Sequence, residues 1–201
     1  MIDDAQTRRK PATSTRRTAR PGPLAFIPAA FDDFDEQIDE WWQRLRGTPA
    51  VDRVFYMASE VGDFGLVWLT IGAAQAALGP AAKTPVFLRL AGALAFESVV
   101  VNGGIKSLFR RERPEWGQHR PLSLRRPRTS SFPSGHASSA VTAAILLTDR
   151  ATPLAPVYWA LAAVVATSRV HVKIHHASDV IGGIAVGVAL GAAIRRFVPL
   201  P

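Results

Sequence analysis

Three short groups of polar residues in the second half of the chain have the types and spacing that phosphate chemistry requires. Together they supply three fixed cations, a helix start opened by glycine, two histidines and a carboxylate. These suffice to bind a phosphoryl group and to transfer it without a metal. In chain order the groups are Lys106 with Arg113 and Pro114, then Pro133, Ser134, Gly135 and His136, then Ser168 and Arg169 with His175 and Asp179.

The run from Pro133 to His136 precedes a segment rich in Ala, Val and Leu, and it predicts the start of a helix. Ser134 suits the N-cap position, and Gly135 lets a ligand approach the backbone closely. The free N–H groups and the positive dipole end of a helix start bind anions. Because Pro-Ser-Gly is also ordinary turn chemistry, this run alone does not decide the function.

The third group contains a histidine and a carboxylate, His175 and Asp179, four residues apart. On a helix these side chains share a face, and Asp179 can accept the Nδ1 proton of His175, which leaves Nε2 as a nucleophile. A hydrogen bond on a helix surface is the simpler interpretation of this pair taken alone. Three cations, Lys106, Arg113 and Arg169, would neutralise phosphate oxygens and stabilise the charge of a transition state.

A metal site is the alternative for the same histidines. His171, His175 and Asp179 follow at four-residue intervals, a spacing that could hold zinc. No glutamate base follows His171, however, and the nearby arginines would repel a dication, so we predict no metal and no cofactor. The remaining arginines of the central loop are assigned to solvent or to lipid headgroups: Arg110, Arg111, Arg125, Arg126 and Arg128.

Five apolar segments must position these groups. A single one could be a buried helix of a soluble protein, because a membrane span needs about 20 apolar residues and several segments are shorter. Five in succession with short links instead predict an all-α membrane helical bundle with about five transmembrane helices. The segments cover roughly residues 64–79, 86–105, 132–148, 151–168 and 180–194.

Single residues inside these segments predict how the helices pack. Gly183, Gly187 and Gly191 follow at four-residue spacing and would form a helix face on which another backbone can approach closely. Exposing the charged side chains of Arg89 and Glu97 to lipid would cost free energy. Both are therefore expected to face the protein interior in a structural role.

The N-terminal part of the chain is highly charged. We divide the chain into a basic tail (1–23), expected to be disordered, an amphipathic interfacial segment (24–60) and a membrane-embedded domain (61–201) that carries the phosphate chemistry. An amphipathic helix is expected at residues 31–46. Its paired tryptophans, Trp41 and Trp42, suit a membrane interface, but they could equally pack on the domain.

Composition limits the partners. The net charge of +8 could suit nucleic acid, anionic lipid or a phosphate substrate. The arginines lie in a tail and beside apolar spans without interleaved aromatic residues, which excludes a nucleic-acid module. The absence of cysteine excludes disulfides and thiolate metal sites. The predicted partners are therefore a lipid phosphate substrate and the bilayer, and the oligomeric state does not follow from the sequence.

These motifs resemble those of the type 2 phosphatidic acid phosphatase family, which includes prenyl-diphosphate phosphatases and vanadium haloperoxidases. The family pattern is K-x6-R-P, then P-S-G-H, then S-R-x5-H-x3-D, and the chain matches every specified position. The resemblance covers about residues 55–198. It implies a helical bundle, commonly with six membrane helices, whereas we count five apolar segments and an interfacial helix.

The resemblance also implies a role for each site residue and needs no metal. His175 attacks phosphorus and becomes phosphohistidine, His136 protonates the leaving oxygen and then activates water, and Asp179 orients His175. The phosphate is bound by Lys106, Arg113, Ser134, Gly135 and Arg169.

We therefore expect an integral membrane lipid phosphatase that acts on a polyprenyl phosphate or diphosphate, or on a glycerophospholipid. A vanadate-dependent haloperoxidase-like enzyme and a non-catalytic membrane scaffold are the alternatives. If all five segments cross, the three groups fall on one side of the membrane. The loop 106–133 on that side carries eight Lys and Arg residues, so the positive-inside rule favours the cytoplasmic face of the plasma membrane.

Overall fold

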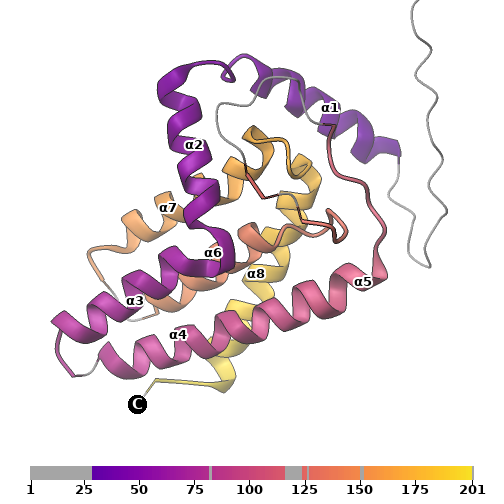
Figure 1. Ribbon diagram of the computed structural model, residues 1–201. Helices are drawn as coiled ribbons and strands as arrows, with labels where there is room; N and C mark the ends of the chain where they lie inside the picture. The colour runs from indigo at the N-terminus through magenta and orange to yellow at the C-terminus, as the bar shows by residue number, and fades with distance from the viewer. Residues whose placement is uncertain (1–28, 82, 116–123, 126, 150–151, 201) are drawn as a thin grey trace, which may run out of the picture.

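The computed structural model describes residues 29–81, 83–115, 124–125, 127–149 and 152–200. The predicted basic tail, 1–23, and the first residues of the interfacial segment, 24–28, lie outside this part of the chain. Within it, all regular structure is helical, which confirms the predicted all-α class. Figure 1 shows a helical bundle with α1 lying across one end.

Each of the five predicted apolar segments forms a helix, and two further helices precede them. Short 3-10 (Asp63–Gly65) and π-helical (Val99–Ile105) stretches join some of these elements. The α-helices are α1 (Ala29–Gln43), α2 (Pro49–Val61), α3 (Leu66–Leu78), α4 (Lys83–Ser98), α5 (Lys106–Leu108), α6 (Gly135–Leu147), α7 (Ala155–His171) and α8 (Ala177–Phe197).

Two continuous helices of the described chain are long and apolar enough to cross a membrane, namely Lys83–Leu108 and Ala177–Phe197. A third candidate is the pair Pro49–Val61 and Asp63–Leu78, if these helices, bent by 65° at their junction, count as one span. Because α6 is shorter, the number of crossings stays a prediction. At 1.5 Å per residue, the 21 residues of α8 reach about 31 Å, the thickness of a hydrocarbon core.

Helix α6 lies at the centre of the bundle. From Ala137 to Leu147 every residue is buried, and α6 packs against α4, α7 and α8. The peripheral helices instead expose large apolar side chains, as a lipid-facing surface requires. Exposed examples are Leu88 and Phe96 on α4, Val157 and Trp159 on α7, and Ile181 and Val188 on α8.

Small residues bring α6 and α8 into close contact. A Cβ atom on Gly187 would lie 2.5 Å from the Ser138 carbonyl oxygen, and one on Gly191 would lie 2.8 Å from Ile145 Cδ1. Thr142 Oγ1 donates a hydrogen bond to the Gly187 carbonyl oxygen at 3.2 Å. The predicted glycine face on α8 is thus the surface on which α6 packs.

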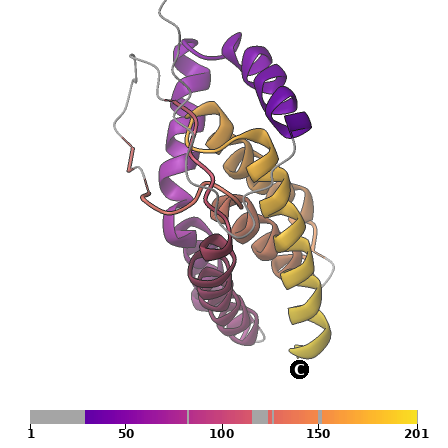
Figure 2. The same cartoon turned by 90° about the vertical axis from the view of Figure 1, so that its right-hand side faces the viewer.

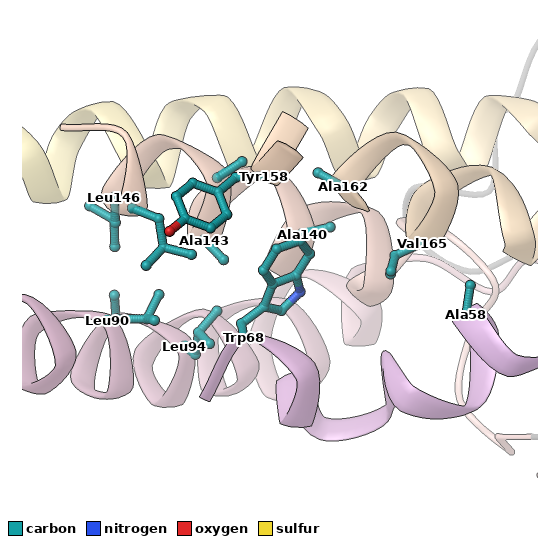
Figure 3. Packing of buried hydrophobic residues seen from close by; sticks show 13 residues of the cluster. Ala58, Trp68, Leu90, Leu94, Ala140, Ala143, Leu146, Tyr158, Ala162 and Val165 are labelled. Carbon is teal, nitrogen blue, oxygen red and sulfur yellow. The ribbon is translucent and has the colours of Figure 1, made fainter. Parts of the chain in front are cut away.

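A second apolar layer joins α3 and α4 to α6 and α7. Trp68 is fully buried at its centre, beside Leu90 and Leu94 of α4 and the small residues of α6, as Figure 3 shows. At the edge of this layer, Gln75 donates a hydrogen bond to the Tyr158 hydroxyl at 2.7 Å. This layer fixes α4 relative to α6, and with it Lys106 of α5, which continues the same long helix.

The charged residues in the middle and last turn of α4, Arg89 and Glu97, face the interior, as predicted. Arg89 is 7% exposed and forms an ion pair of 2.7 Å with Asp149, while Glu97 is 3% exposed, with Lys106 and Ser138 nearby. Burial of the arginine is offset by its ion pair and by bonds to carbonyl oxygens.

Of the two interpretations of the tryptophans of α1, packing on the domain holds for Trp42, and contact with a membrane stays a prediction. Trp42 packs on the domain and donates a hydrogen bond to His171 Nδ1 at 2.8 Å, whereas Trp41 is 51% exposed. Helix α2, which the sequence analysis did not foresee, packs against α7. The proposed boundary between residues 60 and 61 therefore falls at the end of a helix of the bundle, and the domain division stays a prediction.

Replacing Gly187 with alanine should destabilise the bundle by about 1–3 kcal/mol, because the added methyl group would overlap the α6 backbone. The measurement is thermal unfolding of the purified protein in detergent. Gly92→Ala is the matched control, because a Cβ atom there meets nothing within 4 Å. Equal unfolding temperatures for the two variants would contradict the proposed packing.

Candidate active site

The predicted site residues gather at one end of the bundle, where α6 and α8 begin and α7 ends. The Ser134 N–H donates a hydrogen bond to the Asp179 carbonyl oxygen at 2.9 Å, which joins the starts of α6 and α8. Figures 1 and 2 show that α8 runs from this end to the opposite end of the bundle, with α1 lying above its start.

Helix α6 starts as the sequence predicts. Ser134 is its N-cap, and its hydroxyl accepts a bond of 3.4 Å from the Ala137 N–H. A Cβ atom placed on Gly135 would lie 3.9 Å from Lys106 Nζ, so Lys106 reaches the N-terminus of α6. Lys106 is 7% exposed, and its charge adds to the positive end of the helix dipole.

His175 lies between a cation and a carboxylate. Its Nε2 is 3.2 Å from Arg113 Nη1, and its Nδ1 is 3.5 Å from Asp179 Oδ2, which is at the long limit of a hydrogen bond. Because a guanidinium can only donate, Nε2 must accept, and the proton of the neutral ring is then on Nδ1, facing Asp179. This is the tautomer that leaves Nε2 as a nucleophile.

The surroundings of His175 favour its neutral form. Burial lowers the pKa of the imidazole well below its usual value, and Arg169 and Arg113 lower it further, while Asp179 opposes them. The net direction is downward, so the ring is neutral at physiological pH.

Asp179 accepts hydrogen bonds on both oxygens. Its Oδ2 accepts from the His176 N–H at 2.9 Å, within the first turn of α8, and its Oδ1 accepts from Arg111 at 2.6 Å. The expectation that Arg111 faces solvent or lipid headgroups is therefore wrong. Its side chain is 9% exposed and also pairs with Asp35, because the loop after α5 folds back against the start of α8.

Two residues that the sequence analysis missed hold the second histidine, His136. Its Nε2 lies 3.1 Å from the Ser59 carbonyl oxygen and 3.1 Å from Asp63 Oδ1. Asp63 lies where the chain bends between α2 and α3, with the left-handed Phe64 next to it. Gly62 permits the contact, because a Cβ atom there would be 2.8 Å from His136 Cδ2.

Arg169 connects this side of the site to the last turn of α7. It is 2% exposed, and its Nη1 donates to the Ser59 hydroxyl and, at 3.4 Å, to the Ser59 carbonyl oxygen. The same carbonyl oxygen contacts His136. Arg169 and His136 are therefore held beside each other by one residue of α2.

His171 belongs to a different group of contacts. Its Nδ1 accepts from Trp42 at 2.8 Å, and its Nε2 lies 2.8 Å from Asp52 Oδ1. Both ring nitrogens thus serve the contact of α1 and α2 with α7. Among the described residues, the acidic and histidine side chains form no group of three or more arranged to hold a metal ion.

The comparisons identify the family. The model of the PAP2 superfamily matches residues 86–200. The chain belongs to the PAP2 superfamily. It is 36% identical over 138 residues to the decaprenylphosphoryl-5-phosphoribose phosphatase of Mycobacterium tuberculosis, over 68% of this chain and 74% of that protein. The enzyme of the same name from Mycolicibacterium smegmatis is 35% identical over 142 residues, covering 69% of this chain and 74% of the relative.

Two solved structures share the fold of this PAP2 protein. One is a transmembrane PAP2 type phosphatidylglycerolphosphate phosphatase from Bacillus subtilis, with a TM-score of 0.59 and 22% identity over 86% of this chain and 88% of that chain. The other is Aquifex aeolicus LpxE, with a TM-score of 0.59 and 22% identity over 79% and 94%. The family model and the relatives confirm the prediction of a PAP2 phosphatase. The shared fold, together with two helices long and apolar enough to cross a membrane, supports the predicted membrane bundle.

The pKa of His175 in this PAP2 protein is measurable without any assumption about catalysis. In protein with ¹⁵N-labelled histidine, NMR should find the ring still neutral at pH 6.5, because burial and the two arginines disfavour the imidazolium. Arg113→Gln removes one of these cations and should raise the pKa. A wild-type pKa at or above 6.5, the value of an unperturbed histidine, would contradict the described environment.

Proposed function

We propose that the chain hydrolyses a phosphate ester of a polyprenyl-linked lipid, with a polyprenylphosphoryl sugar phosphate as the leading substrate. The observation that carries this proposal is the position of His175 between Arg113 and Asp179 at the end of an apolar bundle, where burial lowers the pKa of the ring. The substrate class is supported by relatives of 35–36% identity that are named decaprenylphosphoryl-5-phosphoribose phosphatase.

A hollow beside Arg113 offers room for a polar headgroup. It has a volume of about 640 Å³ and lies between the two arms of the loop that follows α5. Its lining combines charged side chains with hydroxyl groups, as a sugar phosphate would require. The polar residues that line it include Arg110, Glu112, Arg113, Arg128, Thr129 and Ser130.

In this proposal the phosphate binds at the N-terminus of α6. Ser134 and Gly135 present the helix start, and Lys106, Arg113 and Arg169 neutralise the phosphate oxygens. When the phosphate binds, Arg113 donates its hydrogen bond to a phosphate oxygen instead of to His175, because a charged oxygen is the stronger acceptor. The lone pair of Nε2 is then free to attack.

The first chemical step forms a phosphohistidine. The Nε2 lone pair of His175 attacks phosphorus, the phosphorus–oxygen ester bond breaks, and the leaving oxygen takes a proton from the imidazolium form of His136. Burial and Arg169 lower the pKa of His136 to about 4 in the free protein, so the bound anionic phosphate must raise this pKa before the step. Asp179 stabilises the positive charge that develops on His175. The fixed cations stabilise the negative charge on the transferring phosphoryl group.

The second step releases phosphate. His136, now neutral, takes a proton from water as its oxygen attacks phosphorus, and the phosphorus–nitrogen bond breaks so that its electron pair returns to His175. Asp63 and Ser59 hold Nε2 of His136, and among the described residues no hydrogen bond engages Nδ1. We assign the proton transfers to Nδ1, with Asp63 stabilising the imidazolium.

The test of this mechanism uses two histidine variants and a metal-free assay. His175→Ala should abolish phosphate release from a polyprenylphosphoryl sugar phosphate in EDTA, since no other group replaces the nucleophile. His136→Ala should retain acid-labile radioactive phosphate on the protein with p-nitrophenyl phosphate, whose leaving group needs no proton. Unchanged turnover of folded His175→Ala would contradict the proposal, and a requirement for vanadate would favour the haloperoxidase alternative.

We further propose that the protein lies in the plasma membrane and that its active site is on the cytoplasmic face. The loop at the site end is rich in arginine, and α8 carries the chain to the opposite end of the bundle. A reporter fused after Pro201 should therefore be active only outside the cell. A reporter active in the cytoplasm would place the site on the outer face instead.

A further inference from the structure

Asp35 of α1 contacts the start of α8 from outside the residues that match the family model. One carboxylate oxygen accepts from the Ser178 N–H at 2.7 Å, and the other accepts from the Ser178 hydroxyl at 2.7 Å. Asp35 is 6% exposed, unlike the neighbouring Asp33, which is exposed. A carboxylate at this depth is stable only with such partners.

Arg111 connects Asp35 to the histidine pair. Its Nη2 donates to Asp35 Oδ2 at 2.5 Å, and its Nη1 donates to Asp179 Oδ1 at 2.6 Å and to the Ser178 hydroxyl at 2.6 Å. Burial alone would lower the pKa of Arg111, but the Asp179 and Asp35 carboxylates outweigh burial and raise it. A continuous chain of buried charges thus runs from α1 to His175.

The other end of α1 is anchored at the C-terminus of α7. Arg46, in the turn after α1, donates to the carbonyl oxygens of Val170 and His171, each at 2.9 Å. Lys173 pairs with Asp39 at 3.0 Å. The loop that carries His175 is therefore held at both of its ends by α1 and the turn that follows it.

We propose that Asp35 and Arg111 are positioning residues of the phosphatase reaction, acting through Asp179. Arg111 occupies Oδ1 of Asp179, so that Oδ2 is directed to His175, and Asp35 holds the guanidinium in that orientation. This inference rests on the proposed roles of His175 and Asp179. It extends the active site to α1 and gives this helix a function beyond membrane contact.

The test compares Asp35→Asn with Asp33→Asn, which removes an exposed carboxylate from the same helix. Asp35→Asn and Arg111→Gln should each lower kcat by about 10–100-fold, the loss typical when a partner that orients a functional side chain is removed. KM should change little in Asp35→Asn, because Asp35 does not line the hollow beside Arg113. Arg111 does line it, so the Arg111 variants are compared by kcat at saturating substrate. Arg111→Lys should recover part of the kcat lost in Arg111→Gln, and Asp33→Asn should match the wild type.

A double-mutant cycle separates positioning from a merely structural role. If Asp35 acts through Asp179, Asp35→Asn should cause no further loss of kcat in an Asp179→Asn background. Wild-type kcat in Asp35→Asn, additive losses in the cycle, or a loss explained by less folded protein would overturn the inference. Failure of the proposed function would show separately, as turnover that survives His175→Ala.

Discussion

The site depends on the close contact between the first turns of α6 and α8. The bond from the Ser134 N–H to the Asp179 carbonyl oxygen joins them, and a Cβ atom on Gly183 would collide with the Ser134 carbonyl oxygen. Two positive helix ends thus lie side by side, which is unfavourable unless negative charge lies between them. The Asp179 carboxylate supplies part of that charge, and a bound phosphate would supply more.

Electrostatic complementarity explains why the site is suited to an anion. Lys106, Arg113 and Arg169 are all at least 91% buried. Lys106 and Arg169 lie on helices, and Arg113 is held by carbonyl oxygens of Ile174, Thr129 and Ser130. Burial, with Arg169 and Arg113, lowers the pKa of His175 and so preserves its lone pair, while the cost of burying the cations is offset by carboxylates and carbonyl oxygens. A dianionic substrate would complete this balance, because preorganised cations need not reorient as charge develops.

The local part of this arrangement could be predicted from sequence. The four-residue spacing of His175 and Asp179, the helix start at Ser134 and the glycine face on α8 all depend on residues close along the chain. The structure brings these groups together, although His175 lies in the loop before α8 and not on the helix face that its spacing from Asp179 suggests. The apolar segments and the inward direction of Arg89 likewise follow from hydrophobicity alone.

The partners of the histidines could not be predicted in this way. Asp63 reaches His136 only because the chain bends after α2, and Arg111 reaches Asp179 only because the loop after α5 folds back. Asp35 is far from Asp179 in the sequence, and nothing in the sequence distinguishes it from its acidic neighbours on α1. Such contacts depend on the packing of whole helices, which residue spacing does not encode.

The central claim is that Nε2 of His175 is the atom that bonds to phosphorus. A crystal structure of the protein with orthovanadate, a mimic of the phosphoryl transition state, tests it most directly. The account predicts a bond between vanadium and Nε2 of His175. The vanadate oxygens should contact Lys106, Arg113 and Arg169, and His136 should lie on the side of the vanadium opposite to His175. Vanadate bonded to another residue, or bound away from the start of α6, would contradict it.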